Sequence, residues 1–560
     1  MNQMAEDTGT ATSGIPTKRH CVQDTPQSSP KRVKVDLQPT MGANTPESNA
    51  DIPQSSKTSP KRRDAAGYPK SRHGKEKYGK NVGRRRRRDH DHPERNEVGA
   101  EATEADPQDA AEKAPRLPKR QSALLIGFCG TGCAGMQIQP DARTIEGVLF
   151  DALVRVGAVS SDNADDATKV NLGRAARTDA GVHAAGNLVS LKLITQIPGV
   201  PDVVAATNKL LPPEIRVWGI VRVQNSFSAR TSCDSRRYTY FLPSYLLIPP
   251  KPGSGLYETF RRQVVPSSNS LPDAGASTNH VHLFWAESPP GSSKDDDLQR
   301  KRRWRAGPED VQRLREIAKK FEGTRNFHNF TVGREFSDRS TQRHMKKIEI
   351  SDPVVYGSTE WISVMIHGQS FMLHQRKMIS ALVLCCRTGT PPQIIEELYG
   401  PRQVFIPKMP SLGLLLEHPI FESYNRKVAG VNEDLSPEDV EFRPQIDFEI
   451  YREEIEKFKQ MHIYDRMRDA EDRKAVFDAW VRSTDAYSGD DLLYLNPKGV
   501  IPTAAVVKRS ERRKNPFREK RRFDVTDFPE NGKIEVDEAE EEGDEQDVVM
   551  DKAELADMEG

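Results

Sequence analysis

Hydrophobic residues form short runs in the middle of the chain and are sparse near both ends. The run 123–128 is apolar and is followed by Gly130, a pattern typical of a buried strand that ends in a turn. Thr144 precedes apolar residues at helical spacing, as an N-cap residue does. Order is therefore predicted to begin at Ser122, with a strand and then a helix whose apolar positions are Val148, Leu149, Leu153 and Val154.

Further strands are predicted at 188–193, 215–223 and 236–242. In the last of these, Tyr238 and Tyr240 share one face, because side chains two residues apart in a strand point the same way. The pattern thus places two aromatic rings side by side.

The second half of the predicted core opens with Pro308, which begins a helix with an apolar stripe from Val311 to Phe321. The order of strands and helices lacks the regular βαβ rhythm of a Rossmann or barrel fold. It predicts an α+β (mixed α/β) protein, most simply a sheet with helices on one face. The remaining predicted elements are strands at 347–351, 361–367 and 412–416 and a helix at 371–386.

Composition divides the chain into a core with two tails. We expect residues 119–430 to form the core, interrupted at 250–306 by a polar surface insertion too long for an ordinary connection. Apolar residues at helical spacing predict a helical extension over 431–490. Residues 1–118 and 491–560 are poor in paired apolar positions, so we expect both to be disordered.

The net charge of +1 hides separate charged blocks. Basic clusters lie at 30–35, 60–63, 84–88 and 508–522, whereas 535–547 holds nine acidic residues and no basic one. Such blocks repel themselves and resist burial. The N-terminal clusters have the composition of nuclear import signals, which predicts a protein of the nucleus that binds the nuclear import machinery. A solvated RNA-binding arm is the alternative.

The six cysteines form no CxxC pair and have no zinc-finger spacing to histidine, which favours reduced thiols in the cytosol or nucleus. Cys129 and Cys133 are the candidate ligands of a structural zinc, although ordinary buried thiols are the simpler interpretation. The chain has no apolar run of membrane length and no signal-peptide pattern, which predicts a soluble, non-secreted protein.

The segment Gly173–Ala184 is the richest in candidate chemistry. Asp179 lies two residues after Arg177 and two before Gly181, among small side chains that let a planar ligand approach the backbone. Read from the residues alone, the segment is either a ligand site or a tight loop with a surface Arg–Asp pair.

The run Arg177–Ala184 resembles the signature of the TruA family of tRNA pseudouridine synthases, and the preceding residues look like the eukaryotic nuclear branch of that family. The resemblance covers roughly residues 120–485. It implies the pseudouridine synthase fold, a central mostly antiparallel sheet with flanking helices and two similar subdomains with a cleft between them. Further similar motifs, in the family's order, are Gly130–Gln137, Leu211–Val217, Phe227–Arg230, Arg236–Tyr240, Phe321–Phe330, Gly368–Gln375 and Phe405–Glu417.

The resemblance implies an isomerase that flips a uridine out of tRNA, or another structured RNA, and re-attaches its base through carbon without a cofactor. Asp179 would be the nucleophile, attacking either C6 of the base or C1′ of the ribose. Arg177 would orient the carboxylate and keep it ionised. Tyr238 would stack on the base and is a candidate acceptor of the C5 proton. A non-catalytic RNA-binding chaperone or scaffold with the same fold is the alternative function.

The resemblance also implies RNA-binding residues. Leu414 would pack against the uracil. The chain has no coiled-coil seam, so we expect a monomer. The family motif has one more residue between Gln375 and Arg376, and a residue missing from a helix would rotate the rest of that helix by about 100°. The other candidates for contact with RNA are Arg174, His183, Arg230, Arg236, Arg237 and Arg376.

Overall fold

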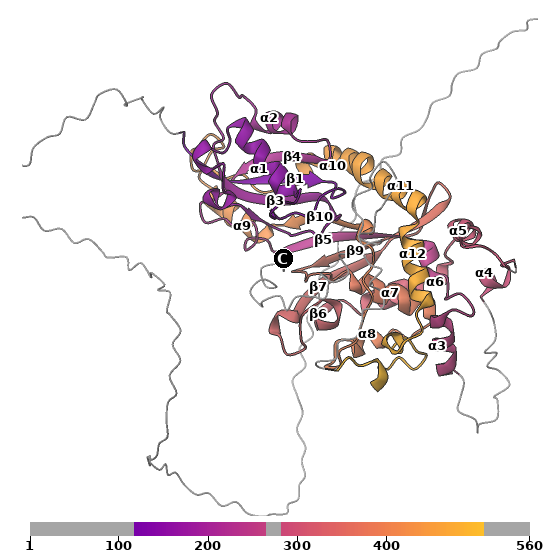
Figure 1. Ribbon diagram of the computed structural model, residues 1–560. Helices are drawn as coiled ribbons and strands as arrows, with labels where there is room; N and C mark the ends of the chain where they lie inside the picture. The colour runs from indigo at the N-terminus through magenta and orange to yellow at the C-terminus, as the bar shows by residue number, and fades with distance from the viewer. Residues whose placement is uncertain (1–116, 265–281, 290, 509–560) are drawn as a thin grey trace, which may run out of the picture. The chain divides into compact units, whose positions relative to one another are not determined.

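The computed structural model describes residues 117–264, 282–289 and 291–508 (Figure 1). The three N-terminal basic clusters, the acidic run at 535–547 and all but the first residue of the cluster at 508–522 lie outside these residues. The strands are β1 (Arg120–Phe128), β2 (Gly173–Arg174), β3 (His183–Leu193), β4 (Ile215–Arg222), β5 (Ser235–Pro243), β6 (Gly323–Asn326), β7 (Gln342–Ile350), β8 (Val354–Tyr356), β9 (Thr359–Gly368) and β10 (Leu414–Ile420).

These strands form one sheet in the order β4-β1-β3-β10-β5-β9-β7-β6, with β2 on β3 and β8 on β9. Within the described residues every strand pair is antiparallel except β10 with β3. Each strand predicted from the sequence is present. The α+β class and the mostly antiparallel sheet are confirmed.

Two helices, α1 (Ile145–Val156) and α2 (Val203–Leu210), cover one face of the N-terminal half of the sheet (Figure 1). The Thr144 hydroxyl accepts a hydrogen bond from the Gly147 N–H at 3.2 Å, so the predicted N-cap is present. Leu149 and Leu153 of α1 are fully buried with Leu124 of β1. The helix therefore forms where its apolar stripe meets the strand.

The opposite face of the same strands is also covered. Leu124 belongs to the core beneath α1, whereas its neighbour Leu125 belongs to a separate core with Phe421 and Phe458. Successive strand residues face opposite sides. Helices α9 (Glu422–Val431) and α10 (Arg452–Phe458) supply this second layer, so the simple expectation of helices on one face was wrong.

The C-terminal half of the sheet packs against α6 (Pro308–Lys319), α7 (Lys377–Thr388) and α12 (Val476–Ala486). The indole N–H of Trp480 in α12 donates to the Lys408 carbonyl at 3.0 Å. This contact joins the predicted helical extension to the core. The other helices of four residues or more with α geometry are α3 (Gly255–Val264), α4 (Leu283–Ala286), α5 (Lys294–Arg303), α8 (Ile394–Glu397) and α11 (Asp465–Lys474).

The described parts of segment 250–306 are helical and packed, which polar composition did not predict. Lys301 of α5 is buried and its Nζ lies 2.8 Å from the Asp478 carboxylate of α12. The indole N–H of Trp285 donates to the Pro249 carbonyl at 2.8 Å. A buried ion pair and a buried tryptophan thus attach this segment to the rest of the fold.

The helix predicted at 371–386 begins later, because α7 starts at Lys377. The preceding residues form a turn in which the Gln375 side-chain oxygen accepts from the Met372 N–H at 2.7 Å. His374 has a φ of 57°, a left-handed conformation. The residue missing beside Gln375 therefore falls in a turn, where the argument from helical rotation does not apply.

None of the helices in the described residues combines the length and the apolar character that a membrane span requires. Cys129, Cys233, Cys385 and Cys386 are free thiols. Within the described part of the chain, no three His, Cys, Asp or Glu side chains are grouped as metal ligands. A structural zinc bound by Cys129 and Cys133 stays a prediction from the sequence.

Candidate active site

Asp179 lies in a loop that packs against the glycine-rich turn after β1. The Met136 N–H donates to the Thr178 carbonyl at 3.1 Å, and the Val182 N–H donates to the Asp179 carbonyl at 3.2 Å. A Cβ atom at Gly130 would lie 2.1 Å from the Val182 carbonyl oxygen, so this approach requires glycine. The turn thereby fixes the backbone that presents Asp179.

Strand β5 contributes Arg236 and Tyr238 on one face. Arg236 is 3% exposed, and its Nε and Nη2 donate to the Ala175 carbonyl at 3.2 and 2.6 Å. Its Nη1 donates to the Gln369 carbonyl at 3.0 Å. The guanidinium therefore joins the segment before Asp179 to the turn after β9. Its predicted phosphate contact does not fit this buried position.

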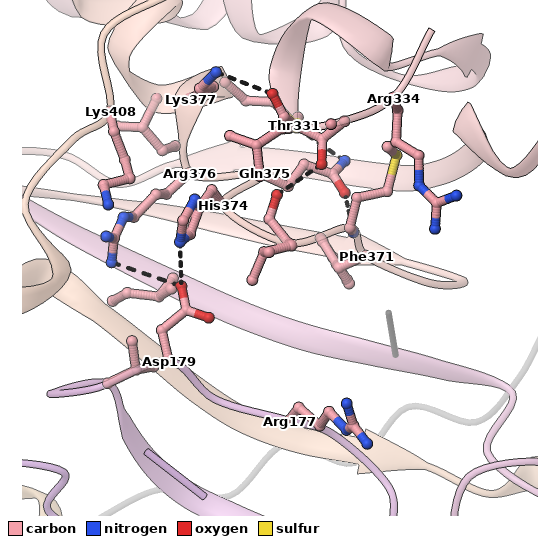
Figure 2. Close-up of a pocket in the computed structure, with 18 of the residues that line it drawn as sticks. Arg177, Asp179, Thr331, Arg334, Phe371, His374, Gln375, Arg376, Lys377 and Lys408 are labelled. Carbon is pink, nitrogen blue, oxygen red and sulfur yellow. Dashed lines mark hydrogen bonds and ion pairs between the residues drawn. The ribbon is translucent and has the colours of Figure 1, made fainter. Parts of the chain in front are cut away.

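The turn before α7 brings the side chains of His374 and Arg376 to Asp179 (Figure 2). The Asp179 Oδ2 lies 3.8 Å from His374 Nε2 and 3.9 Å from Arg376 Nη1. The Arg376 side chain is 2% exposed, whereas those of Asp179 and His374 are 30% and 26% exposed. A buried guanidinium attracts a nearby carboxylate more strongly than an exposed one does, because opposite charges interact more strongly away from bulk water.

Asp179 lines a cleft of about 990 Å³ that is bordered by both halves of the sheet. That volume is near the upper end of the range for small-ligand pockets and exceeds the needs of one pyrimidine. Asp179 is the acidic member of the described lining. More basic than acidic side chains line the cleft, so it suits an anionic ligand. The basic residues are Arg177, Arg236, Arg334, Arg376, Lys377 and Lys408.

Arg177 lines the cleft, but in Figure 2 its guanidinium points away from Asp179. Its charge acts on Glu146, whose pKa is raised by burial and lowered in part by Arg174 and Arg177. The predicted role of Arg177 in orienting Asp179 therefore does not fit the structure, in which Arg376 occupies that place. Arg177 and Asp179 are two residues apart, so their backbones must be close. In a loop this spacing does not determine where either side chain points.

Tyr238 presents a mostly buried ring to the cleft. Its ring meets that of Phe371 edge to face, with centroids 4.7 Å apart. Burial raises the pKa of Tyr238 far above its ordinary value; Arg236 opposes this shift and Asp179 adds to it. The phenol is therefore neutral at physiological pH. Leu414, at the start of β10, lines the same cleft.

Arg174 and His183 have partners inside the protein. Arg174 forms an ion pair with the buried carboxylate of Glu146 and does not belong to the cleft lining. His183 is 1% exposed, and its Nδ1 accepts from the Gly130 N–H at 3.2 Å. Burial opposes ionisation of the Cys129 thiol, yet His183 lowers the pKa of that thiol to about 6. The predicted RNA contact of His183 is wrong, because burial leaves no surface for it.

Arg230 and Arg237 are exposed and do not line the cleft. Arg237 follows Arg236 in β5 and therefore points to the face opposite Tyr238. Their contacts with RNA stay predictions. Because neighbouring strand residues face opposite sides of the sheet, the sequence alone could have shown that Arg237 points away from the face that carries Tyr238.

The structure adds cleft residues that were not singled out from the sequence. His374 and Lys377 flank Arg376, and the Lys377 Nζ donates to the Thr331 carbonyl at 3.0 Å (Figure 2). Lys408 approaches the cleft from the segment before β10. His374 lies inside the motif Gly368–Gln375, but no pattern in the sequence indicates that its ring meets Asp179.

Known proteins resemble this chain over about two thirds of its length. A family model described as tRNA pseudouridine synthase matches residues 317–422. The tRNA pseudouridine synthase 1 of Eremothecium gossypii is 41% identical over 411 residues, which cover 67% of this chain and 75% of that protein. The chain belongs to the tRNA pseudouridine synthase family.

Other members of the family are similar over comparable lengths. The tRNA pseudouridine synthase 1 of Schizosaccharomyces pombe is 37% identical, covering 69% of this chain and 87% of that protein. The tRNA pseudouridine(27/28) synthase of Saccharomyces cerevisiae is 37% identical, covering 64% of this chain and 97% of that protein. The family resemblance inferred from motifs is confirmed. The family-model match contains Arg376, His374 and Leu414, whereas Asp179 and Tyr238 precede it.

Proposed function

We propose that this protein isomerises specific uridines in tRNA to pseudouridine, with Asp179 as the nucleophile. The observation that supports this most is the position of the Asp179 carboxylate, which lies in a basic cleft within 4 Å of Arg376 and His374. Membership of the tRNA pseudouridine synthase family supports isomerisation as the class of reaction.

Arg376 is the group that orients the nucleophile in this proposal. A carboxylate in a cleft loses hydration, and an opposite charge nearby compensates for that loss. The Arg376 guanidinium supplies that charge from a buried position 3.9 Å away. The anion then attacks C6 of the uracil or C1′ of the ribose, and the bond from N1 to C1′ breaks.

Tyr238 and Leu414 form the surfaces between which the flipped base lies. The Tyr238 ring is fixed by Phe371, and Leu414 begins the strand beside it. An aromatic face and an aliphatic side chain hold a planar pyrimidine by stacking and dispersion. Neither contact is specific for sequence, so we infer that tRNA shape selects the uridine.

The basic lining of the cleft receives the RNA backbone next to the flipped nucleotide. Lys377 and Lys408 lie beside the Asp179 pocket in Figure 2, and Arg334 lies farther along the same cleft. Because such cations displace counterions from phosphates, binding should weaken steeply as salt rises. The cost of extruding the base, a few kcal/mol, is offset by these contacts.

We further propose that the protein acts in the nucleus as a monomer and without a cofactor. The isomerisation is redox-neutral and transfers no phosphate, so it requires no nicotinamide, flavin or nucleotide. The basic clusters at 30–35, 60–63 and 84–88 support nuclear import. A tagged protein lacking residues 28–88 should accumulate in the cytoplasm, and one that stays nuclear would contradict this placement of the signal.

The test of the activity is pseudouridine formation by the purified full-length chain on a folded tRNA transcript, measured by chromatography of the digested nucleosides. We expect conversion in buffer that contains a chelator and no added cofactor. A non-catalytic RNA chaperone would bind the same transcripts and leave every uridine unchanged. Mapping pseudouridine in RNA from cells with and without the protein would then identify the target positions.

A further inference from the structure

The cleft accommodates only a small part of a tRNA. Its volume of about 990 Å³ suits a small ligand, so it has room for the flipped nucleotide and its nearest neighbours. A folded RNA is many times larger and is recognised largely by its shape, through contacts with phosphates and ribose hydroxyls along its helices. Most of those contacts must therefore form on surfaces of the protein outside the cleft.

Four basic side chains form a row across the sheet, on the face opposite Tyr238. Residues directly opposite one another in antiparallel strands place their side chains on the same face, about 5 Å apart. The four residues, called the basic row, therefore span about 15 Å across four neighbouring strands. In register, Lys347 of β7 pairs with His367 of β9, His367 with Arg237 of β5, and Arg237 with His418 of β10 (Figure 1).

A β-bulge places a fifth basic side chain beside the basic row. The pairing of β7 with β9 shifts between Met345 and Lys347, so Lys346 is the extra residue of the bulge. Its Nζ donates to the Ser235 hydroxyl at 3.3 Å, and the His367 Nε2 lies 2.9 Å from the same hydroxyl. Bulges commonly re-aim a side chain next to a functional site. Ser235, which is fully buried, thus holds Lys346 and His367 side by side.

The basic row is unfavourable for the sheet on its own, because like charges directly opposite one another are destabilising. Burial lowers the pKa of His367, and the charges of Lys346 and Arg237 lower it further. Burial also lowers the pKa of His418, and Arg237 again adds to the shift. Each cation therefore opposes protonation of the neighbouring imidazole. A bound anion would remove this repulsion.

Carboxylates near the basic row leave two of its cations available to a ligand. Lys347 forms an ion pair with Glu349, and Glu422 partly opposes the lowered pKa of the β9 histidine. Arg237 and Lys346 are both exposed, and neither forms an ion pair with any residue that the structure describes. Lys346 and Arg237 thus present unneutralised positive charge to solvent at one place on the sheet.

We propose that the basic row, with Lys346 beside it, binds the phosphate backbone of the substrate tRNA outside the cleft. The inference rests on the proposed function and adds a second contact surface to it. Lysine and arginine are the usual partners of phosphates, whereas the centres of protein interfaces are depleted in lysine and rich in aromatic residues. Arg237 also follows Arg236, which lines the cleft, so the basic row lies on the reverse side of a strand that borders the cleft.

The double variant Arg237→Gln/Lys346→Gln removes the two cations that have no carboxylate partner. Full-length wild-type and variant proteins are compared on two RNAs, a folded tRNA transcript and a hairpin that contains only the arm with the target uridine. Dissociation constants are measured over a range of salt concentrations, and single-turnover conversion is measured at saturating protein. The matched control is Lys209→Gln/Lys319→Gln, which removes two exposed lysines from α2 and α6. Thermal unfolding checks that both double variants fold.

We expect the Arg237→Gln/Lys346→Gln protein to bind the full tRNA roughly 10-fold more weakly, because two phosphate contacts are lost. The slope of log affinity against log salt should become shallower by about 1 to 2. Hairpin affinity and the conversion rate at saturation should match the wild type, and the control protein should match it in every measurement.

An unchanged salt slope on the full tRNA would overturn the proposal and would leave the basic row as a surface for an acidic protein. Equal losses of affinity on the tRNA and the hairpin would also overturn it, because the two side chains would then act at the cleft. A wild-type protein that binds the tRNA but converts no uridine would instead contradict the proposed function. The binding measurements would still decide the role of the basic row.

Discussion

Arg236 joins β5 to the Ala175 carbonyl through two N–H groups of one guanidinium. A third N–H of the same group reaches the Gln369 carbonyl. The loop before Asp179 and the turn before Arg376 are thus held to one rigid planar cation. Asp179 and Arg376, whose side chains lie 3.9 Å apart, follow the two segments that this cation connects.

Arg236→Lys should reduce both stability and activity. A lysine ammonium cannot reproduce the planar geometry that serves two carbonyls, so we expect a loss of about 1.5–3 kcal/mol in the free energy of unfolding. The rate of pseudouridine formation should fall as well. Urea unfolding and single-turnover assays measure the two effects. Arg155→Lys is the matched control, because that side chain is exposed on α1 and should change neither quantity.

Tyr238→Phe should be tolerated better than Tyr238→Ala. Phenylalanine keeps the ring that packs against Phe371 and stacks on the base, whereas alanine removes it. Because burial keeps the phenol neutral, the wild-type rate should show no tyrosine ionisation across the alkaline range. Single-turnover rates of both variants over that range make the comparison. Equal losses in the two would show that the hydroxyl, and not the ring, carries the role of Tyr238.

Glu471 predicts how stability depends on pH. Burial raises its pKa to about 7, while the Tyr245 hydroxyl and the Phe477 N–H donate to its oxygens. In the unfolded chain its pKa is lower, near 4.5, so between these values the folded state binds more protons. The raised pKa of Glu471 therefore stabilises the folded state by at most about 3 kcal/mol. This stabilisation is complete below the unfolded pKa and is lost as pH rises through about 7.

The comparison of wild type with Glu471→Gln isolates this group. Glutamine can accept from the Phe477 N–H through its oxygen and donate to the Tyr245 hydroxyl through its NH2 group, and it does not titrate. Over about pH 5 to 8 the unfolding free energy of the variant should decline less than that of the wild type. Parallel curves for the two proteins would show that Glu471 does not titrate in this range.

The strands were predictable from sequence because their patterns are local. Alternation in 236–242 and the Thr144 N-cap depend on neighbours a few residues away, and both were predicted correctly. The start of α7 was predicted too early, because the apolar residues Phe371 and Met372 stand at a spacing that suits a helix. The packing of segment 250–306 was missed since its buried lysine finds its carboxylate in α12, far along the chain.

The candidate site was predicted only in part for the same reason. Asp179 stands out among small residues near a glycine, and Tyr238 follows from strand alternation and the family resemblance. The cation beside Asp179 was assigned to Arg177, the nearest arginine in sequence. In the structure it is Arg376, which β9 and the turn after it bring across from the other half of the sheet. Proximity in the sequence does not decide ion pairs of this kind.

Asp179→Asn tests most directly whether the Asp179 carboxylate performs the chemistry. Asparagine has nearly the same shape but is neutral and a poor nucleophile. Pseudouridine formation and tRNA affinity are measured with the same folded transcript. We predict that conversion is abolished while the dissociation constant stays close to that of the wild type. Full conversion by the Asp179→Asn protein would contradict the role of this carboxylate as the nucleophile.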